Sequence, residues 1–270
     1  MDEHRNLPDI NRLSVLAAVI LLAYAFTPFL KLPARSLALQ LPGFLFELNL
    51  EATTLVSLLA AALAAAGTAW LLHGHPQLGS QHTFQHWLLP ALTAWVIGVP
   101  LSTLQPGAQW WAVFAFGGLL LMLVFVAEYI VVDIGDSRQA PAAVGLTAVS
   151  FALYLTLAIA MRAAGLRLYL ILPALFSAIA LVALRSLYLR LGGRWCWAWA
   201  LGVAIVVAQF AMGLHYLPLS SLRYGLLLLG LAYALTSTAG AVEEGRSWRT
   251  LWIEPAIMLA ALWGLSFVIG

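Results

Sequence analysis

Four of the six histidines lie in one short segment of the chain, at His73, His75, His82 and His86. Imidazole nitrogens are good ligands for zinc, copper and iron, and His82 and His86 share a helical face if a helix begins early enough. The segment contains no carboxylate and no cysteine, so a metal would need four neutral imidazoles or ligands from elsewhere. We therefore expect polar residues at a membrane surface here and keep a metal site as the alternative.

A second set of candidates consists of charged residues at the ends of long apolar stretches, where an ionisable group is by default a functional candidate. Five of them are expected on the inner side of a membrane: Glu128, Asp133, Arg185, Arg190 and Glu254. An unpaired charge facing hydrocarbon costs about 2.5–3.5 kcal/mol on insertion scales, so we expect Glu128 to meet Arg185, or failing that Arg190 or Glu254. A salt bridge that fixes helix packing is favoured over a catalytic or proton-handling acid.

An outer polar cluster is expected at Glu51, Arg162, Arg223 and His215. Both the inner and the outer set carry both signs of charge, which suits structural pairing at least as well as a substrate path. A proton or ion relay would need a series of acids through the middle of the membrane, and the sequence places almost none there.

Several enzyme classes are excluded by missing motifs. The chain has no Gly-rich phosphate loop, no Gly-x-Ser-x-Gly elbow and no aspartate-rich pair of the kind that holds magnesium and a prenyl diphosphate. Its one lysine, Lys31, falls outside every long apolar stretch, which excludes a retinal Schiff base. The catalytic residues and the cofactor therefore remain unassigned.

The elements that must position these residues follow from the composition. Of the 270 residues 63% are hydrophobic and 9% are charged, whereas an ordinary soluble domain has about 25% charged residues. The net charge is +2 without a basic block, so nucleic acid is excluded as a partner, and the single Cys196 excludes an internal disulfide. The composition predicts an all-α, polytopic transmembrane bundle that forms a single integral membrane domain over residues 1–270.

Nine stretches have the length and apolar character of membrane-spanning helices. They are Leu13–Phe29, Ala52–Leu72, Trp87–Leu104, Trp110–Val132, Ala142–Met161, Leu168–Leu184, Trp195–Leu217, Tyr224–Ala241 and Leu251–Ile269.

The loop between the first two stretches, residues 31–50, has a different pattern. Apolar and other residues alternate over Leu37–Leu41 and again over Phe44–Leu50, on either side of Pro42-Gly43. A period of two on both sides of a Pro-Gly turn predicts a β-hairpin. We expect a short external hairpin that caps the helices, with a lid over an outward cavity as the alternative.

The arginines and the lysine predict the orientation. With a cytoplasmic N-terminus the inner side holds Arg5, Arg12, Arg138, Arg185, Arg190, Arg194, Arg246 and Arg249, and the outer side holds Lys31, Arg35, Arg162, Arg167 and Arg223. Eight against five favours a cytoplasmic N-terminus and a location in the inner, cytoplasmic membrane.

Four segments carry a resemblance to a known family: LPGFLFELNLEATTLV, the HGHP loop, HWLLPALTAW and AEYIVVD. With them the chain resembles an uncharacterised family of bacterial multi-pass membrane proteins, a domain of unknown function. The resemblance implies a multi-pass topology and brings no activity, cofactor or catalytic residue with it.

The sequence favours a non-catalytic scaffold or accessory subunit of a membrane complex, because the connections are short and no catalytic motif is present. A membrane enzyme or binding protein for a lipid-like molecule, acting near the cytoplasmic face, is the alternative, and a transporter comes third. Membrane lipids are the expected partners, together with other membrane subunits for an accessory role.

Overall fold

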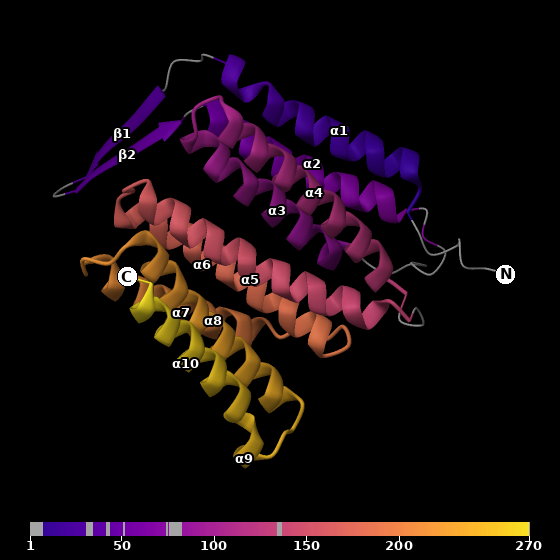
Figure 1. Cartoon of the computed structure of the whole chain (residues 1–270), viewed down its shortest axis with the longest axis vertical. Coiled ribbons are helices and arrows are strands. Elements are labelled where there is room, and N and C mark those ends of the chain that lie inside the picture. The colour runs from indigo at the N-terminus through magenta and orange to yellow at the C-terminus, as the bar shows by residue number, and fades with distance from the viewer. Residues whose placement is uncertain are drawn as a thin grey trace. The chain divides into compact units, whose positions relative to one another are not determined.

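A computed structural model describes residues 8–30, 35–41, 44–50, 52–73, 75, 83–133 and 137–269. The chain forms two compact units, Met1–Asp133 and Ile134–Gly270, called unit 1 and unit 2 below. Each unit is a bundle of helices, and each is described by itself (Figure 1).

Unit 1 contains four long helices. Its elements are α1 (Ile10–Ala25), the short 3-10 helix η1 (Thr27–Phe29), β1 (Arg35–Leu41), β2 (Phe44–Leu50), α2 (Ala52–Leu72), α3 (Phe84–Thr103) and α4 (Ala108–Val131). Helix α1 packs against α2 and α4, and α3 packs against the same two helices, so the four form a closed bundle. The Asp9 carboxylate begins α1 by accepting a hydrogen bond from the backbone N–H of Asn11 at 2.9 Å, as an N-cap residue does.

Small residues let α2 approach its neighbours in unit 1. Ala60 and Ala64, one turn apart on α2, are both fully buried. Gly98 of α3 faces Ser57 of α2 so closely that a Cβ atom at Gly98 would lie 2.1 Å from the Ser57 Oγ. Close approach of this kind provides the dispersion contacts that hold helices together where lipid gives no hydrophobic drive.

The two strands pair in an antiparallel hairpin, in a register that runs from Arg35 opposite Leu50 to Leu41 opposite Phe44. The hairpin stands at the end of unit 1 where α1 ends and α2 begins (Figure 1). Of its side chains only that of Gln40 is described. Its external position and its role as a cap therefore stay predictions.

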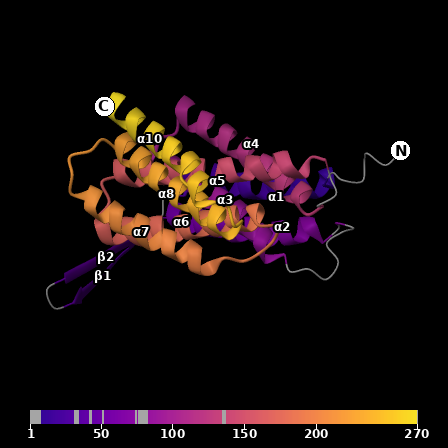
Figure 2. The same ribbon diagram turned by 90° about the horizontal axis from the view of Figure 1, so that it is seen from below.

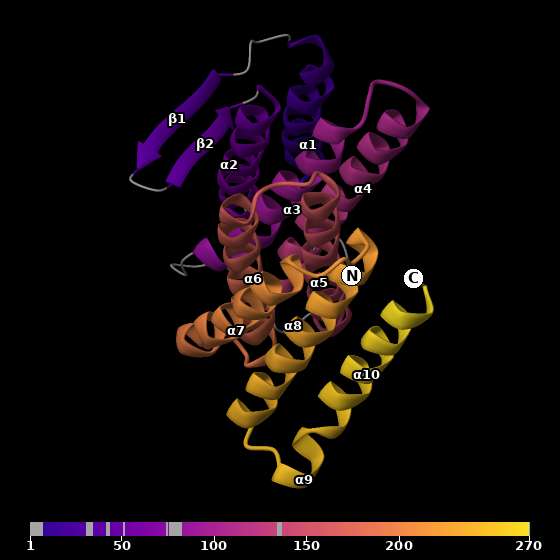
Figure 3. The ribbon, with the colours of Figure 1, turned by 90° about the vertical axis from the view of Figure 1, so that its left-hand side faces the viewer.

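Unit 2 is built around one central helix. Its elements are α5 (Gln139–Ala163), α6 (Leu168–Arg190), α7 (Trp197–His215), α8 (Ser221–Glu243), the four-residue α9 (Trp248–Leu251) and α10 (Ile253–Val268). Helix α8 packs against α5, α6, α7 and α10. Helix α10 runs back along α8 after the short α9, as Figures 2 and 3 show.

Eight helical segments are long and apolar enough to cross a membrane among the residues that the structure describes: α1 together with η1 (Ile10–Phe29, 20 residues), and each helix from α2 to α8. The ninth predicted span is not among them, because α10 has only 16 residues and, unlike α1, is not lengthened by a neighbouring helical turn that the span includes. Pro255 explains the break between α9 and α10, since its ring would clash with the carbonyl of Leu251 in a continuous helix.

Candidate functional site

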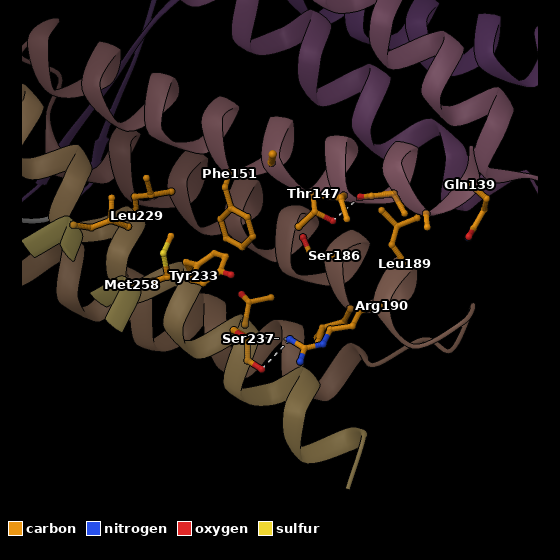
Figure 4. Close-up of a pocket in the computed structure, with 17 residues that line it drawn as sticks. Gln139, Thr147, Phe151, Ser186, Leu189, Arg190, Leu229, Tyr233, Ser237 and Met258 are labelled. Carbon is orange, nitrogen blue, oxygen red and sulfur yellow. Dashed lines mark hydrogen bonds between the residues drawn. The ribbon is translucent and has the colours of Figure 1, made fainter. Parts of the chain in front are cut away.

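A cavity of about 680 Å³ lies within unit 2, between α5, α6, α8 and α10. Most of its wall is apolar, with Phe151, Leu229, Met258 and Leu262 among the lining side chains. Figure 4 shows Leu229 toward one end and Arg190 toward the other. The volume falls within the range of about 300–1,000 Å³ that is usual for small-molecule sites.

The polar end of the cavity is organised by Arg190, in the last turn of α6. Its Nε donates to the Oε1 of Glu244 at 2.5 Å, and its Nη2 donates to the Oε2 of the same carboxylate at 3.1 Å. Its Nη1 donates to the carbonyl oxygen of Ser237 at 3.2 Å and lies 3.3 Å from the Ser237 Oγ (Figure 4). The planar guanidinium is thereby held in a two-point contact that a lysine could not reproduce.

Glu244 lies just beyond the end of α8, where it joins two arginines. Besides Arg190 it contacts Arg246, whose Nε lies 2.6 Å from its Oε2. The hydrogen bond from Arg190 is the largest cause of a pKa of the Glu244 carboxyl below its usual value of 4.5, and the charges of both arginines act in the same direction. Glu244 is therefore ionised at neutral pH.

Glu254, in the first turn of α10, joins the same network from the other side. Its Oε1 accepts a hydrogen bond from the Tyr233 hydroxyl at 2.8 Å and from the Ser237 Oγ at 3.3 Å. The predicted inner residues Arg190 and Glu254 thus come together through Ser237. A carboxylate at the N-terminal end of a helix is also favoured by the helix dipole.

Ser186 of α6 lines the cavity one helical turn before Arg190. Its side chain is buried, and within the described part of the chain its Oγ has no hydrogen-bond partner. Sequence reasoning missed this residue, because a serine in an apolar stretch has no distinguishing pattern.

Unit 1 holds a separate buried polar cluster. Glu128 of α4 accepts a hydrogen bond from the Nδ1 of His86 of α3 at 2.7 Å, and the two side chains are 0% and 6% exposed. Asp133 and His75 are buried in the same unit, with the imidazole of His75 edge-on to the Tyr129 ring at 4.6 Å between centroids. Burial lowers the pKa of His75, the charge of Asp133 raises it, and His86 lowers it further.

The structure divides the inner residues between the two units. Glu128 and Asp133 belong to unit 1, whereas Arg185, Arg190 and Glu254 belong to unit 2. Arg185 is buried, and its guanidinium lies over the Tyr188 ring at 5.5 Å. One partner of Glu128 is His86, a residue that the sequence analysis assigned to the histidine set.

The histidines themselves point to different partners. The Nδ1 of His73 lies 3.1 Å from the Ala69 carbonyl one turn earlier, whereas His75 contacts Tyr129 and His86 contacts Glu128. His82 lies outside the described residues. Among the residues that are described, no group of three or more His, Cys, Asp or Glu could hold a metal ion.

The outer residues come together in part. In unit 2, Arg162 donates to the backbone carbonyls of His215 at 3.0 Å and Leu217 at 3.1 Å, and its guanidinium lies 5.5 Å from the Tyr224 ring. It therefore satisfies carbonyls at the C-terminal end of α7, which is a structural role. Arg223 lies in the first turn of α8, where its backbone N–H is capped by Ser220 at 3.3 Å, and Glu51 lies outside the described residues.

Comparison with known proteins places the chain in a family without assigning a function. No curated protein and no solved structure matches it. Residues 32–269 match the family described as protein of unknown function (DUF5656). Since this match covers most of the sequence, the chain belongs to the DUF5656 family.

Proposed function

We propose that the protein binds an amphipathic, lipid-like molecule in the cavity of unit 2. The observation that carries the proposal is the cavity itself, whose apolar wall leads to a polar end formed by Arg190, Ser237 and Tyr233. An apolar site with a few convergent polar groups is the usual form of a small-molecule site.

The cavity is accessible from the side of the helices. Two of its lining side chains, Val144 of α5 and Met258 of α10, are 70% and 37% exposed. In a membrane, such an opening beside the spanning helix α5 would face hydrocarbon, so the apolar part of a lipid could enter without crossing a polar layer. Its head would then lie at the end where Arg190 binds Glu244.

Our proposal places lipid binding ahead of the scaffold role that the sequence favours, and the cavity supports it. Exposed apolar side chains such as Leu201 and Ile205 on α7 would suit a scaffold that binds a partner subunit. Any helix that faces lipid also exposes apolar side chains, so these residues do not indicate a partner. Transport would require a polar cavity that reaches the middle of the membrane, whereas most of the wall of this cavity is apolar.

The proposal includes a placement in the cytoplasmic membrane with a cytoplasmic N-terminus. The distribution of positive charge supports this placement, because eight arginines lie on the predicted inner side and only five cations, four arginines and one lysine, lie on the predicted outer side. The ends of α6 and α8 that carry Arg190 and Glu244 would then lie at the cytoplasmic face.

Blocking the cavity tests the proposal. Ala148 of α5 lines the cavity, and Ala148→Phe would place a ring inside it. Ala260, on the exposed side of α10 and outside the cavity lining, provides the matched control Ala260→Phe. In native mass spectrometry of protein purified in mild detergent, we expect retained lipid to fall by about tenfold in Ala148→Phe and to stay unchanged in Ala260→Phe.

Equal lipid retention in the wild type and Ala148→Phe would refute lipid binding in this cavity. A stable complex with another membrane protein that survives purification in both variants would then support the accessory role instead.

A further inference from the structure

One hydroxyl of the cavity wall, that of Ser186, differs from the others in its hydrogen bonding. Ser186 is 6% exposed and lines the cavity, yet within the described part of the chain its Oγ has no hydrogen-bond partner. The other hydroxyls of the α5 and α8 walls have partners. Thr147 donates to the Ala143 carbonyl at 2.9 Å and Thr236 to the Ala232 carbonyl at 2.8 Å, each within its own helix, and the hydroxyls of Tyr233 and Ser237 donate to Glu254. Buried polar groups in native proteins nearly always have a partner, so an unsatisfied hydroxyl in a cavity wall marks the place of a ligand atom or a water.

The position of Ser186 along α6 gives the depth of that atom. Ser186 lies four residues before Arg190, which is about 6 Å along the helix axis. Figure 4 shows Ser186 on the cavity wall between Thr147 and Arg190. A ligand whose head lies beside Arg190 therefore needs a hydrogen-bond acceptor about one helical turn deeper, where its hydrocarbon begins.

We infer that the cavity takes an acyl-ester lipid, whose ester carbonyl accepts a hydrogen bond from the Ser186 Oγ. This inference rests on the proposed function and adds the chemical class of the ligand. An ester carbonyl joins the polar head of such a lipid to its chain, at the depth where Ser186 lies. Alkyl ethers and isoprenoid alcohols have no carbonyl there. An ether oxygen can accept a hydrogen bond but lies in the chain itself and does not project from it as a carbonyl oxygen does, so these lipids would make a weaker contact with the hydroxyl.

The test compares two probes with the same head group: dioleoyl phosphatidylglycerol and its dialkyl ether counterpart, which lacks both carbonyls. Equal amounts compete for the purified full-length protein, and native mass spectrometry measures the ratio of the two complexes. We expect the wild type to prefer the ester lipid by about three- to tenfold, the value of one neutral hydrogen bond.

Two variants assign the preference to one atom. Ser186→Ala should bring the ratio close to one, whereas Thr156→Val should keep the wild-type ratio, because Thr156 is not among the cavity-lining residues and its hydroxyl donates to the Ala152 carbonyl of its own helix at 2.9 Å. An equal ratio in the wild type, or an unchanged preference in Ser186→Ala, would overturn the inference. The wild-type ratio alone decides the question if Ser186→Ala fails to fold.

Failure of this inference differs from failure of the proposed function. If both lipids bind equally well and Ala148→Phe removes both, the cavity binds lipid and only the ester preference is wrong. If neither probe depends on Ala148, the cavity is not the lipid site.

Discussion

The carboxylate of Glu128 contacts the imidazole of His86 at 2.7 Å, and both side chains are almost completely buried. Replacing Glu128 by alanine would remove this contact. Breaking a buried pair by removal of one partner typically costs about 3–5 kcal/mol, because the other group has lost its compensation for desolvation. Glu128→Gln keeps an acceptor oxygen but no charge. A charge-assisted hydrogen bond is roughly twice as strong as a neutral one, so we expect this variant to lose about 1–2 kcal/mol.

The assay is reversible unfolding in mixed micelles, followed by circular dichroism. A double-mutant cycle with His86→Ala isolates the pairwise contribution, which we expect at about 1–3 kcal/mol for two buried groups in direct contact. Thr93→Val is the matched control, because Thr93 is equally buried on α3 but donates only to the carbonyl of Leu89 in its own helix at 2.7 Å. It should cost less than about 1 kcal/mol.

Additive effects of Glu128→Ala and His86→Ala would refute the reasoning, since two residues that form a pair cannot be independent. Equal losses in Glu128→Gln and Glu128→Ala would show that the charge on Glu128 contributes nothing to the contact with His86.

Two further predictions concern stability. Gly98→Ala should lower the unfolding free energy by about 1–3 kcal/mol, because its Cβ would meet the Ser57 Oγ at 2.1 Å, whereas Gly145→Ala, with open space around it, should lose nothing in the same unfolding assay. The lowered pKa of Glu244 means that its contribution to stability is fully present above the unfolded-state pKa and is lost as the pH falls through the folded-state pKa. Between about pH 6 and about pH 3 the melting temperature of the wild type should therefore fall more than that of Glu244→Gln, and parallel curves for the two proteins would contradict this.

The membrane-spanning helices could be predicted from the sequence because a run of about 20 apolar residues is a strong local signal. Ala60 and Ala64 share a buried face of α2, because residues four apart in a helix lie on the same side. Pro255 carried a signal that was missed. A proline three residues into α10 ends the preceding helical segment, and the predicted ninth span became a four-residue helix and a 16-residue helix.

The polar contacts were less predictable, because they depend on which helices are neighbours. His86 lies near the start of α3 and Glu128 near the end of α4, and antiparallel helices bring these two ends together. The sequence did indicate that both residues lie at a similar depth in the membrane, but the prediction placed His86 among the histidines and Glu128 among the inner charged residues.

No pattern in the sequence indicated the cavity, because it forms only where residues of α5, α6, α8 and α10 pack together. Ser186 is one of those residues and has no distinguishing pattern of its own.

The shortness of α10 would affect the bilayer beside it if unit 2 lies in a membrane as proposed. Sixteen residues span about 24 Å, whereas the hydrocarbon layer of a typical membrane is about 30 Å thick. Such a hydrophobic mismatch is relieved when the bilayer thins locally, so that head groups move inward beside the short helix. Because α10 forms one wall of the cavity with Met258 and Leu262, and carries Glu254 at its start, the thinned lipid would lie next to the cavity opening. If unit 2 binds lipid as proposed, membrane thickness would be a variable that acts on the entry of lipid into it.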